Sequence, residues 1–351
     1  MKKKLLLIAP FTKSHGQGVV SLIVEKILSE EKTHQIVINT HKSNVFFIKF
    51  IYNIFLIFKI SYTAFVKKPN IFYFTPSRSF LGSIRDLNVL LIKKYFLKSL
   101  RLVGHLHGSD LKCFLNQNLY GKFLEQLYID LLDILIINSN SHKKYALGNN
   151  FNNYRIINNP ITNNIPIENK NKIKQTIKFL HVSNPIAEKG LLEGINWVEK
   201  HCPVPWKFFI VGWNKNEFCN VYKNSSFNTK KIIDDDRVAF LGKLFGEDYK
   251  SIFLKANVFI FPSFYPIEAQ PLVLIDSIMF NHVVIISHFK MLKDFKIFPS
   301  VKFIEKTKNW NEISILLKNK SLLEKSRDLA IKKFDVVKFK KKLINTIFKE
   351  N

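Results

Sequence analysis

Acidic residues are scarce in this sequence, and the imbalance of charge bounds its partners. The 351 residues include 27 Asp and Glu against 54 Lys and Arg, a formal net charge of +27. Such a charge suits a polyanionic partner: a nucleic acid, an anionic membrane surface or a phosphorylated substrate. An AT-rich genome also produces it, since Lys, Asn, Ile and Phe are all abundant. Because the lysines are spread along the whole chain, we prefer this compositional cause for most of them.

Cysteine, glycine and proline are also few, and each shortage excludes a class of protein. The three cysteines have no CxxC spacing, so neither a disulfide framework nor a zinc knuckle is indicated, and a reducing cytosolic compartment is expected. With 12 Gly and 12 Pro beside 33 Phe, the chain resembles neither a disordered nor a fibrous protein. Its length and 47% hydrophobic content predict about two domains with substantial cores.

Long uncharged apolar runs are missing as well. In segment 44–68 the longest such run lies between Lys49 and Lys59, short of the ~20 residues that a membrane-spanning helix needs. On a helical wheel these lysines and Asn53 fall on one side and leave a very wide apolar face. We expect first a buried helix and second a helix that lies in a bilayer interface.

A second basic stretch follows. Lys94, Lys98 and Arg101 recur at helical spacing beside Tyr95 and Phe96. Such a face is usually only solvated, but it would suit anionic lipid headgroups.

Apolar strands alternate with helices twice along the chain. The first half begins with LLLIAP, which we interpret as a strand rather than a signal peptide, and the alternation restarts at IKFLHVSNP after the polar stretch 156–171, interpreted as a linker. This pattern predicts an α/β fold of two Rossmann-like, doubly wound domains that face each other across a cleft. The expected ranges are 1–162, 163–328 and a terminal helical segment, 329–351, that packs back on the first domain.

Four short motifs occur where a predicted strand is followed by a predicted helix. Gly16-Gln17-Gly18 opens a helix, where backbone N–H groups favour an anion or a closely approaching substrate, although a plain tight turn has the same appearance. It is not a dinucleotide fingerprint, because Ser21 replaces the third glycine and the next strand lacks the ribose-binding acid.

The motif GHLHGSD places His105 and His107 at the carboxyl end of a strand, followed by Asp110. A histidine there could orient a sugar hydroxyl or stabilise phosphate charge, although paired histidines are more often structural. No third ligand is found by spacing, so a zinc site is rejected.

Two acids, Glu268 and Asp276, lie eight positions apart around a predicted helix start. Pro271 suits the first turn, with Gln270 as its expected cap, and the two carboxylates could accept hydrogen bonds from different hydroxyls of one elongated ligand. Either acid alone could instead be a dipole partner or a solvated residue. Upstream, Lys189-Gly190 opens another helix, where a lysine can reach a diphosphate or simply pair with a neighbouring acid.

Together these motifs resemble a GT-B glycosyltransferase of the large retaining family 4. The resemblance runs over nearly the whole chain, from the Gly16 loop through HGSD, Lys189-Gly190, IVG at 210–212 and FLGK at 240–243 to PSFYPIEAQPLVLID. The family signature is Glu, seven residues, Glu, and here Glu268 and Asp276 stand at its two ends. The chain departs from the family pattern at Asp276, at Asn184, where an Arg is usual, and at Pro271, where a Gly is usual.

The resemblance implies a metal-independent glycosyltransferase with a nucleotide-sugar donor and no cofactor. Glu268 would hold the donor sugar, Asp276 the ribose, and Lys189 the departing diphosphate, while His107 would contact the sugar from the first domain. The expected donor-binding residues are Gly16, Gly18, Asn184, Lys189, Gly212, Leu241, Glu268, Gln270, Leu272 and Asp276, and the expected acceptor-binding residues are Gly16, Gln17 and Asp110.

The expected partners are the donor, a saccharide or lipid-linked acceptor and an anionic membrane surface. We expect a cytoplasmic protein, peripheral on the inner face of the membrane, that acts in polysaccharide, lipopolysaccharide or capsule biosynthesis. Two alternatives stay open: a GT-B relative that binds nucleotide sugar without turnover, and a basic nucleic-acid-binding protein. The second is disfavoured, because the basic residues are scattered rather than interleaved with aromatics in one motif.

Overall fold

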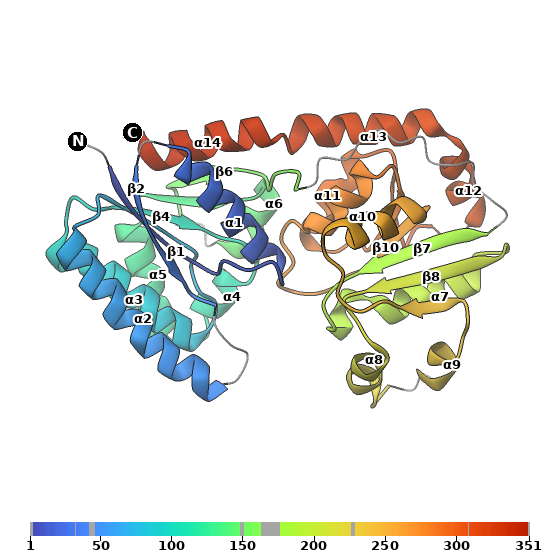
Figure 1. Cartoon of the computed structure of the whole chain (residues 1–351), viewed down its shortest axis with the longest axis horizontal. Helices are drawn as coiled ribbons and strands as arrows, with labels where there is room; N and C mark the ends of the chain where they lie inside the picture. Colours follow the sequence, from blue (N-terminus) through green and yellow to red (C-terminus); the bar gives the residue numbers. More distant parts are fainter. Residues whose placement is uncertain are drawn as a thin grey trace. The chain divides into compact units, whose positions relative to one another are not determined.

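The chain folds into two α/β units (Figure 1). The computed structural model describes residues 3–31, 33–41, 46–147, 151–162, 176–225, 229–307 and 309–349. One unit comprises Met1–Pro160 with Val336–Asn351, and the other Ile161–Asp335. The sequence placed these boundaries after residues 162 and 328. From residue 163 onward, the predicted linker lies outside the described residues.

The first unit is built on a six-stranded sheet in the order β2-β1-β3-β4-β5-β6, with neighbouring strands parallel. Its central strands are almost wholly apolar because helices cover both faces of the sheet. The strands are β1 (Lys4–Ala9), β2 (His34–Asn39), β3 (Ile71–Phe74), β4 (Arg101–His105), β5 (Ile134–Ile137) and β6 (Tyr154–Ile156).

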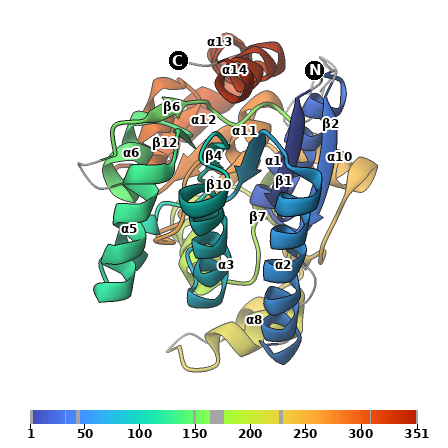
Figure 2. The ribbon, with the colours of Figure 1, turned by 90° about the vertical axis from the view of Figure 1, so that its left-hand side faces the viewer.

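Helical crossovers join these strands, as parallel pairing requires. Helices α1 and α14 lie on one face of the sheet, and α2, α3 and α5 lie on the other (Figures 1 and 2). The helices are α1 (Gly16–Ser29), α2 (Phe46–Lys67), α3 (Phe80–Leu91), the π-helical turn η1 (Ile92–Phe96), α4 (Leu111–Leu115), α5 (Leu119–Leu131), α6 (Asn140–Ala146) and α14 (Val336–Phe348).

The C-terminal helix α14 packs on the first unit. The guanidinium of Arg101 donates a hydrogen bond to the Thr346 carbonyl at 3.1 Å, and the Lys340 ammonium lies 2.6 Å from the Glu30 carboxylate. Arg101 therefore begins β4 and faces α14. Its expected place on one basic helical face with Lys94 and Lys98 is wrong, because the helix ends at Phe96 and the chain turns before β4.

The expectation that α2 is buried is wrong for its outer face. Leu56, Ile60 and Ala64 pack in the core, but Phe58 is 70% exposed and most of the other large apolar side chains of α2 also face outward. Over Phe47–Lys67 the helix is long and apolar enough to span a membrane, although Lys49 and Lys59 interrupt its uncharged run.

The second unit repeats the architecture with the strand order β12-β11-β10-β7-β8-β9. Its described strand pairs are likewise parallel. The strands are β7 (Ile177–Val182), β8 (Trp206–Val211), β9 (Val238–Phe240), β10 (Val258–Phe261), β11 (Val283–Ile286) and β12 (Val301–Phe303). The helices are η2 (Ala187–Lys189), α7 (Leu191–His201), α8 (Lys215–Tyr222), α9 (Thr229–Ile233), α10 (Gly246–Lys255), α11 (Leu272–Met279), η3 (Lys290–Ile297), α12 (Trp310–Lys318) and α13 (Lys320–Lys333).

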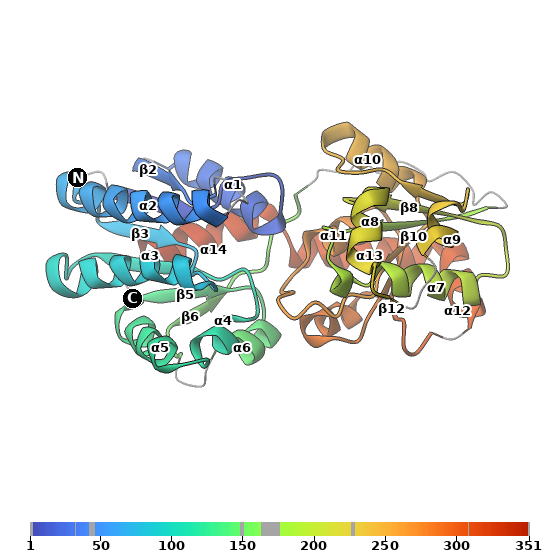
Figure 3. The same ribbon diagram turned by 90° about the horizontal axis from the view of Figure 1, so that it is seen from below.

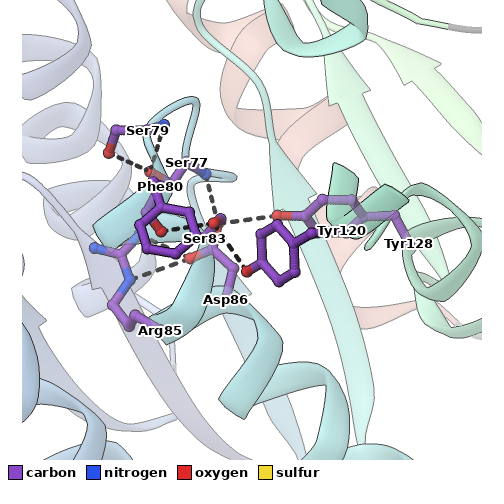
Figure 4. A network of polar contacts seen from close by, with 8 residues as sticks. All are labelled: Ser77, Ser79, Phe80, Ser83, Arg85, Asp86, Tyr120 and Tyr128. Atoms are coloured by element: carbon purple, nitrogen blue, oxygen red, sulfur yellow. Dashed lines mark hydrogen bonds and ion pairs between the residues drawn. The ribbon is translucent and has the colours of Figure 1, made fainter. Parts of the chain in front are cut away.

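A buried polar network fixes the loop that follows β3 in the first unit (Figure 4). The carboxylate of Asp86, fully buried on α3, accepts hydrogen bonds from the Arg85 guanidinium at 2.8 Å, the Tyr128 hydroxyl at 2.9 Å and the Ser77 amide at 2.5 Å. Arg85 is itself only 6% exposed, so its charge depends on this carboxylate. The network therefore joins α3, α5 and the loop at the carboxyl edge of the sheet.

We predict that Asp86→Ala lowers the free energy of unfolding by roughly 3–5 kcal/mol, because it leaves Arg85 buried without a counter-charge. The control is Asp130→Ala, which removes an exposed carboxylate from α5 and should change stability by less than about 0.5 kcal/mol. Urea denaturation followed by circular dichroism measures both. Equal midpoints for the two variants would contradict the prediction.

Candidate active site

The carboxyl edge of the second sheet carries an ion pair between Lys189 and Glu268. The Lys189 Nζ lies 2.5 Å from Glu268 Oε2, and the two side chains are 13% and 11% exposed. Lys189 ends η2, directly before α7, and Glu268 lies in the loop between β10 and α11. The sequence predicted both residues at helix starts but did not predict that they pair.

Aromatic rings and a hydroxyl hold this ion pair in place. The Lys189 Nζ lies 4.4 Å from the ring centroid of Tyr265 and 5.6 Å from that of Phe261. The Ser263 hydroxyl lies 3.3 Å from Glu268 Oε2. Tyr265 and Ser263 were not predicted as site residues, although both lie in the same loop as Glu268, between β10 and α11.

Two glycines allow loops to approach closely at the carboxyl edge of the second sheet. Gly190 has φ +77°, and a Cβ there would lie 2.3 Å from the Pro262 carbonyl oxygen. Gly212, after β8, has φ +91°, and a Cβ there would lie 2.1 Å from the Ser183 carbonyl oxygen. Any side chain at either position would force these loops apart.

The start of α11 offers backbone donors beside Glu268. Pro271 is the N-cap, and no side chain caps the helix, so the expectation that Gln270 is the cap is wrong. Gln270 is instead 8% exposed. The amides at Leu272 and Val273 begin the helix, where unpaired N–H groups and the helix dipole favour an anion.

Asp276 lies on α11, inside the second unit. It is 3% exposed, and its two carboxylate oxygens accept hydrogen bonds from the Thr162 hydroxyl at 3.1 Å and the Tyr249 hydroxyl at 3.0 Å. Burial and the Asp276 charge raise the pKa of Tyr249 well above its usual value. A ribose hydroxyl would have to compete with these two groups for the carboxylate.

The remaining predicted donor residues line the same carboxyl edge. Asn184 follows β7 and is exposed, while Leu241 follows β9 and is partly buried against the core. The Leu241 amide donates to the Ile210 carbonyl at 2.8 Å, which ties β9 to β8 just before Gly212.

In the first unit, the predicted glycine loop opens α1 as expected. His15 is the N-cap, and its Nδ1 accepts a hydrogen bond from the Gly18 amide at 3.1 Å. A Cβ at Gly18 would lie 2.3 Å from the Thr12 carbonyl oxygen, so this position requires the close approach that the motif indicated. Gly16 is exposed and Gln17 partly buried.

His107 lies in a cluster of histidines at the carboxyl edge of the first sheet. Burial, then the neighbouring His105 and Arg78, hold the pKa of His107 well below its usual value, so its imidazole is neutral at pH 7. Its Nε2 is buried and has no hydrogen-bond partner among the described residues. His105 has a structural contact instead: its Nδ1 lies 2.6 Å from the Tyr73 hydroxyl, and burial lowers its pKa to about 3.

Asp110 forms an ion pair that the sequence did not predict. The Arg78 guanidinium donates to the Asp110 carboxylate at 2.8 Å, with both side chains about one-fifth exposed. Arg78 stands in the loop that the Asp86 network fixes, and its position just after a strand is the signal that could have indicated it. His142 holds the preceding turn through Nε2, 3.0 Å from the Gly108 carbonyl.

Metal ligands do not gather in the part of the chain that the structure describes. No group of three or more His, Cys, Asp or Glu side chains there could hold a metal ion. The three cysteines are free. Metal independence stays a prediction.

A known family model matches the second unit. Residues 164–333 match the family model "Glycosyl transferases group 1". No curated protein sequence matches the chain.

Solved structures share the fold over almost the entire chain. A sucrose-phosphate synthase from Thermosynechococcus elongatus superposes with a TM-score of 0.68 at 13% identity, covering 97% of each chain. HepE from Anabaena, solved with UDP and glucose, gives 0.67 at 13% identity and 99% coverage of each chain. The lipopolysaccharide outer core galactosyltransferase WaaB, in its apo form, gives 0.63 at 14% and 99% of each. The fold is therefore GT-B, with two Rossmann-like domains, and its second domain matches a glycosyltransferase family.

We predict that the stability of the second unit falls as the pH is lowered from about 6.5 to 5. Burial lowers the pKa of His181 to about 4; its Nδ1 lies 2.9 Å from the Ile260 carbonyl and its Nε2 2.9 Å from the Ser183 hydroxyl. Between the ordinary pKa of ~6.5 and about pH 4, His181 binds a proton in the unfolded chain but not in the folded one. Lowering the pH from about 6.5 to 5 therefore reduces the free energy of unfolding by up to ~2 kcal/mol.

Urea denaturation followed by tryptophan fluorescence measures this effect, because the four tryptophans all lie in the second unit. His181→Gln should have a smaller pH slope than the wild type, whereas His288→Gln, which removes an exposed histidine, should keep the wild-type slope. An unchanged slope in His181→Gln would contradict the assignment.

Proposed function

We propose that this chain transfers a sugar from a nucleoside-diphosphate sugar to a saccharide or lipid-linked acceptor, with retention of anomeric configuration and without a metal ion. The reaction would serve surface polysaccharide, lipopolysaccharide or capsule biosynthesis on the cytoplasmic side of the membrane. The observation that carries the proposal is the Lys189–Glu268 pair between two helix starts, in the segment that matches glycosyl transferases group 1.

The pair can exchange partners when a donor binds. A diphosphate brings more negative charge than the single Glu268 carboxylate, so the Lys189 ammonium would turn toward it. Glu268 would then be free to accept hydrogen bonds from hydroxyls of the donor sugar. Since both side chains are nearly buried, each charge keeps a partner before and after binding.

Negative charge develops on the departing diphosphate in the transition state, and this site can lower the activation barrier mainly by stabilising that charge. The bond between the anomeric carbon and the diphosphate oxygen breaks, a bond to the acceptor oxygen forms, and the acceptor proton passes to the leaving group. Lys189 and the first amides of α11, near Leu272, would stabilise the oxygen that gains charge. These groups perform the role for which other phosphate sites use a metal.

His107 would contact the donor sugar from the first unit. Its neutral imidazole can donate or accept a hydrogen bond, and a sugar hydroxyl would satisfy the buried Nε2. Gly16, Gln17 and Asp110 would face the acceptor, with Arg78 orienting the Asp110 carboxylate. Arg78 is therefore added to the acceptor-side residues.

A GT-B relative that binds nucleotide sugar without turnover is the second candidate. It is favoured by the Asp276 carboxylate, whose two oxygens already accept hydrogen bonds within the protein, and by Asn184, which replaces an expected cation. Nucleotide binding without transfer to any acceptor would support it. A nucleic-acid-binding protein would instead show a steep salt dependence in filter binding.

We predict that Lys189→Ala and Glu268→Ala each reduce transfer by at least ~10²-fold, because each removes a group placed for the leaving diphosphate or the donor sugar. The assay uses a panel of radiolabelled nucleotide sugars with a lipid extract as acceptor. The control is Lys250→Ala, which breaks a surface pair with Glu247 in the same unit and should leave transfer unchanged.

Circular dichroism establishes that these variants are folded. Retained transfer in either site variant would show that the site is assigned wrongly. If the wild-type protein neither transfers nor hydrolyses any donor and binds no nucleotide, the proposed function is refuted.

We predict that the Asp276→Asn variant distinguishes two roles of Asp276, a contact with the ribose and a structural role inside the second unit. If Asp276 holds the ribose, the variant binds nucleoside diphosphate more weakly but inorganic pyrophosphate as before, in competition calorimetry. If its role is limited to Thr162 and Tyr249, both affinities stay unchanged and the free energy of unfolding falls by ~1–3 kcal/mol, because two partly buried hydroxyls lose a charged acceptor.

A further inference from the structure

The outer face of α2 is apolar from end to end. We call it the α2 face and define it by its exposed large side chains: Phe47, Ile48, Phe50, Ile51, Ile54, Phe55, Phe58, Tyr62, Phe65 and Val66. Figures 2 and 3 show α2 along one side of the first unit, next to α3. A contiguous exposed apolar surface of this kind marks a binding surface rather than ordinary exposure.

The inner face of α2 holds the helix firmly in the fold. Leu56 and Ile60 are buried in the core of the first unit, and the Ser61 hydroxyl pairs with the Asn88 side chain of α3 at 3.2 Å. The helix is also the crossover between β2 and β3, which both pair with β1. If α2 crossed a membrane, it would lose its packing against this sheet. Only its outer face is therefore available to bind a partner.

The π-helical turn η1 extends the apolar surface. The ring of Phe96 packs edge-on against that of Phe65, with centroids 5.1 Å apart. Tyr95 and Phe96 are 62% and 65% exposed. Two segments far apart in sequence therefore form one surface.

Exposed positive charge surrounds this surface, and exposed negative charge is missing from its segments. Between Glu31 and Asp110 the sequence has one acid, Asp86, and it is fully buried. The exposed lysines of these segments are Lys49, Lys59, Lys67, Lys68, Lys94 and Lys98. Among the described residues none of these lysines forms an ion pair with a carboxylate. Lysines are depleted at protein–protein interfaces but are attracted to anionic lipid headgroups.

The surface is also hollowed at one place. Ile48, Ile51, Tyr52 and Phe55 line an apolar hollow of about 330 Å³ on α2. Its lining is apolar, so it is complementary to hydrocarbon.

We propose that the α2 face, with Tyr95 and Phe96, inserts into the interfacial layer of an anionic lipid bilayer. The 22-residue helix would lie flat over ~33 Å, with its apolar side chains ~5–10 Å deep and an acyl chain in the hollow. The six exposed lysines named above contact the headgroups around it. None of its residues belongs to the proposed donor site, so the proposal stands whether or not the chain transfers sugar.

Vesicle flotation of the full-length protein tests the proposal. The probes are vesicles of phosphatidylcholine alone and of phosphatidylcholine mixed with phosphatidylglycerol. The wild-type protein should float with the mixed vesicles, and more weakly with the neutral ones. The double variant Ile51→Glu/Phe58→Glu should bind at least ~10-fold more weakly to both, because it places charge in the acyl layer.

Matched substitutions elsewhere control for charge and exposure. Ile315→Glu changes an isoleucine that is 63% exposed on α12, compared with 51% for Ile51, and should float like the wild type. Lys94→Gln/Lys98→Gln should weaken binding to the mixed vesicles only, by roughly fivefold per lysine at low salt. Lys341→Gln/Lys342→Gln removes the same charge from exposed positions on α14 and should have little effect.

Each contrary result overturns the proposal. Wild-type flotation of Ile51→Glu/Phe58→Glu would show that the α2 face does not bind lipid. If both lysine variants lost vesicle binding equally, the binding would depend on the net charge of the protein and not on this surface. Resistance of the bound protein to alkaline carbonate extraction would indicate a spanning helix. A lipid-independent dimer that Ile51→Glu/Phe58→Glu converts to a monomer, without vesicle binding, would make the face a protein interface.

Discussion

The ion pair between Lys189 and Glu268 is the interaction on which the second unit's site depends. It joins the end of η2 to the loop before α11, across a distance of 2.5 Å, and Gly190 makes this closeness sterically acceptable. Because the lysine and the glutamate neutralise each other, each also restricts the conformation of the other. In the proposed reaction, the diphosphate would meet a lysine whose side-chain freedom is already restricted, which would lower the entropy lost on binding.

Most of the fold could be predicted from the sequence, because buried parallel strands are continuous apolar runs and their helices begin at recognisable turns. The strand from Lys4 to Ala9 and the helix from Gly16 are found as expected. The exposure of α2 could not be predicted. A helical wheel shows a wide apolar face, but only tertiary packing determines whether another element covers it.

The candidate site was predictable to a smaller extent. Positions along the chain placed Glu268 and Lys189 at helix starts, yet pairing across 79 positions depends on how two loops converge. Arg78, the partner of Asp110, could not be predicted either, because this pairing also depends on how separate segments converge. The same holds for the two hydroxyls that donate to Asp276. Two carboxylates at family spacing therefore have different surroundings: one is paired with a cation, and the other is bound by neutral donors in the core.

The π-helical turn η1 fixes the direction in which a surface points. Its 2.9 Å hydrogen bond from the Leu97 amide to the Ile92 carbonyl encloses one residue more than an α-helical turn would. Deleting a single residue there would restore α-helical winding and rotate everything that follows by ~100°. The number of residues in this turn is therefore constrained by geometry, because an insertion or deletion would turn Tyr95 and Phe96 away from α2.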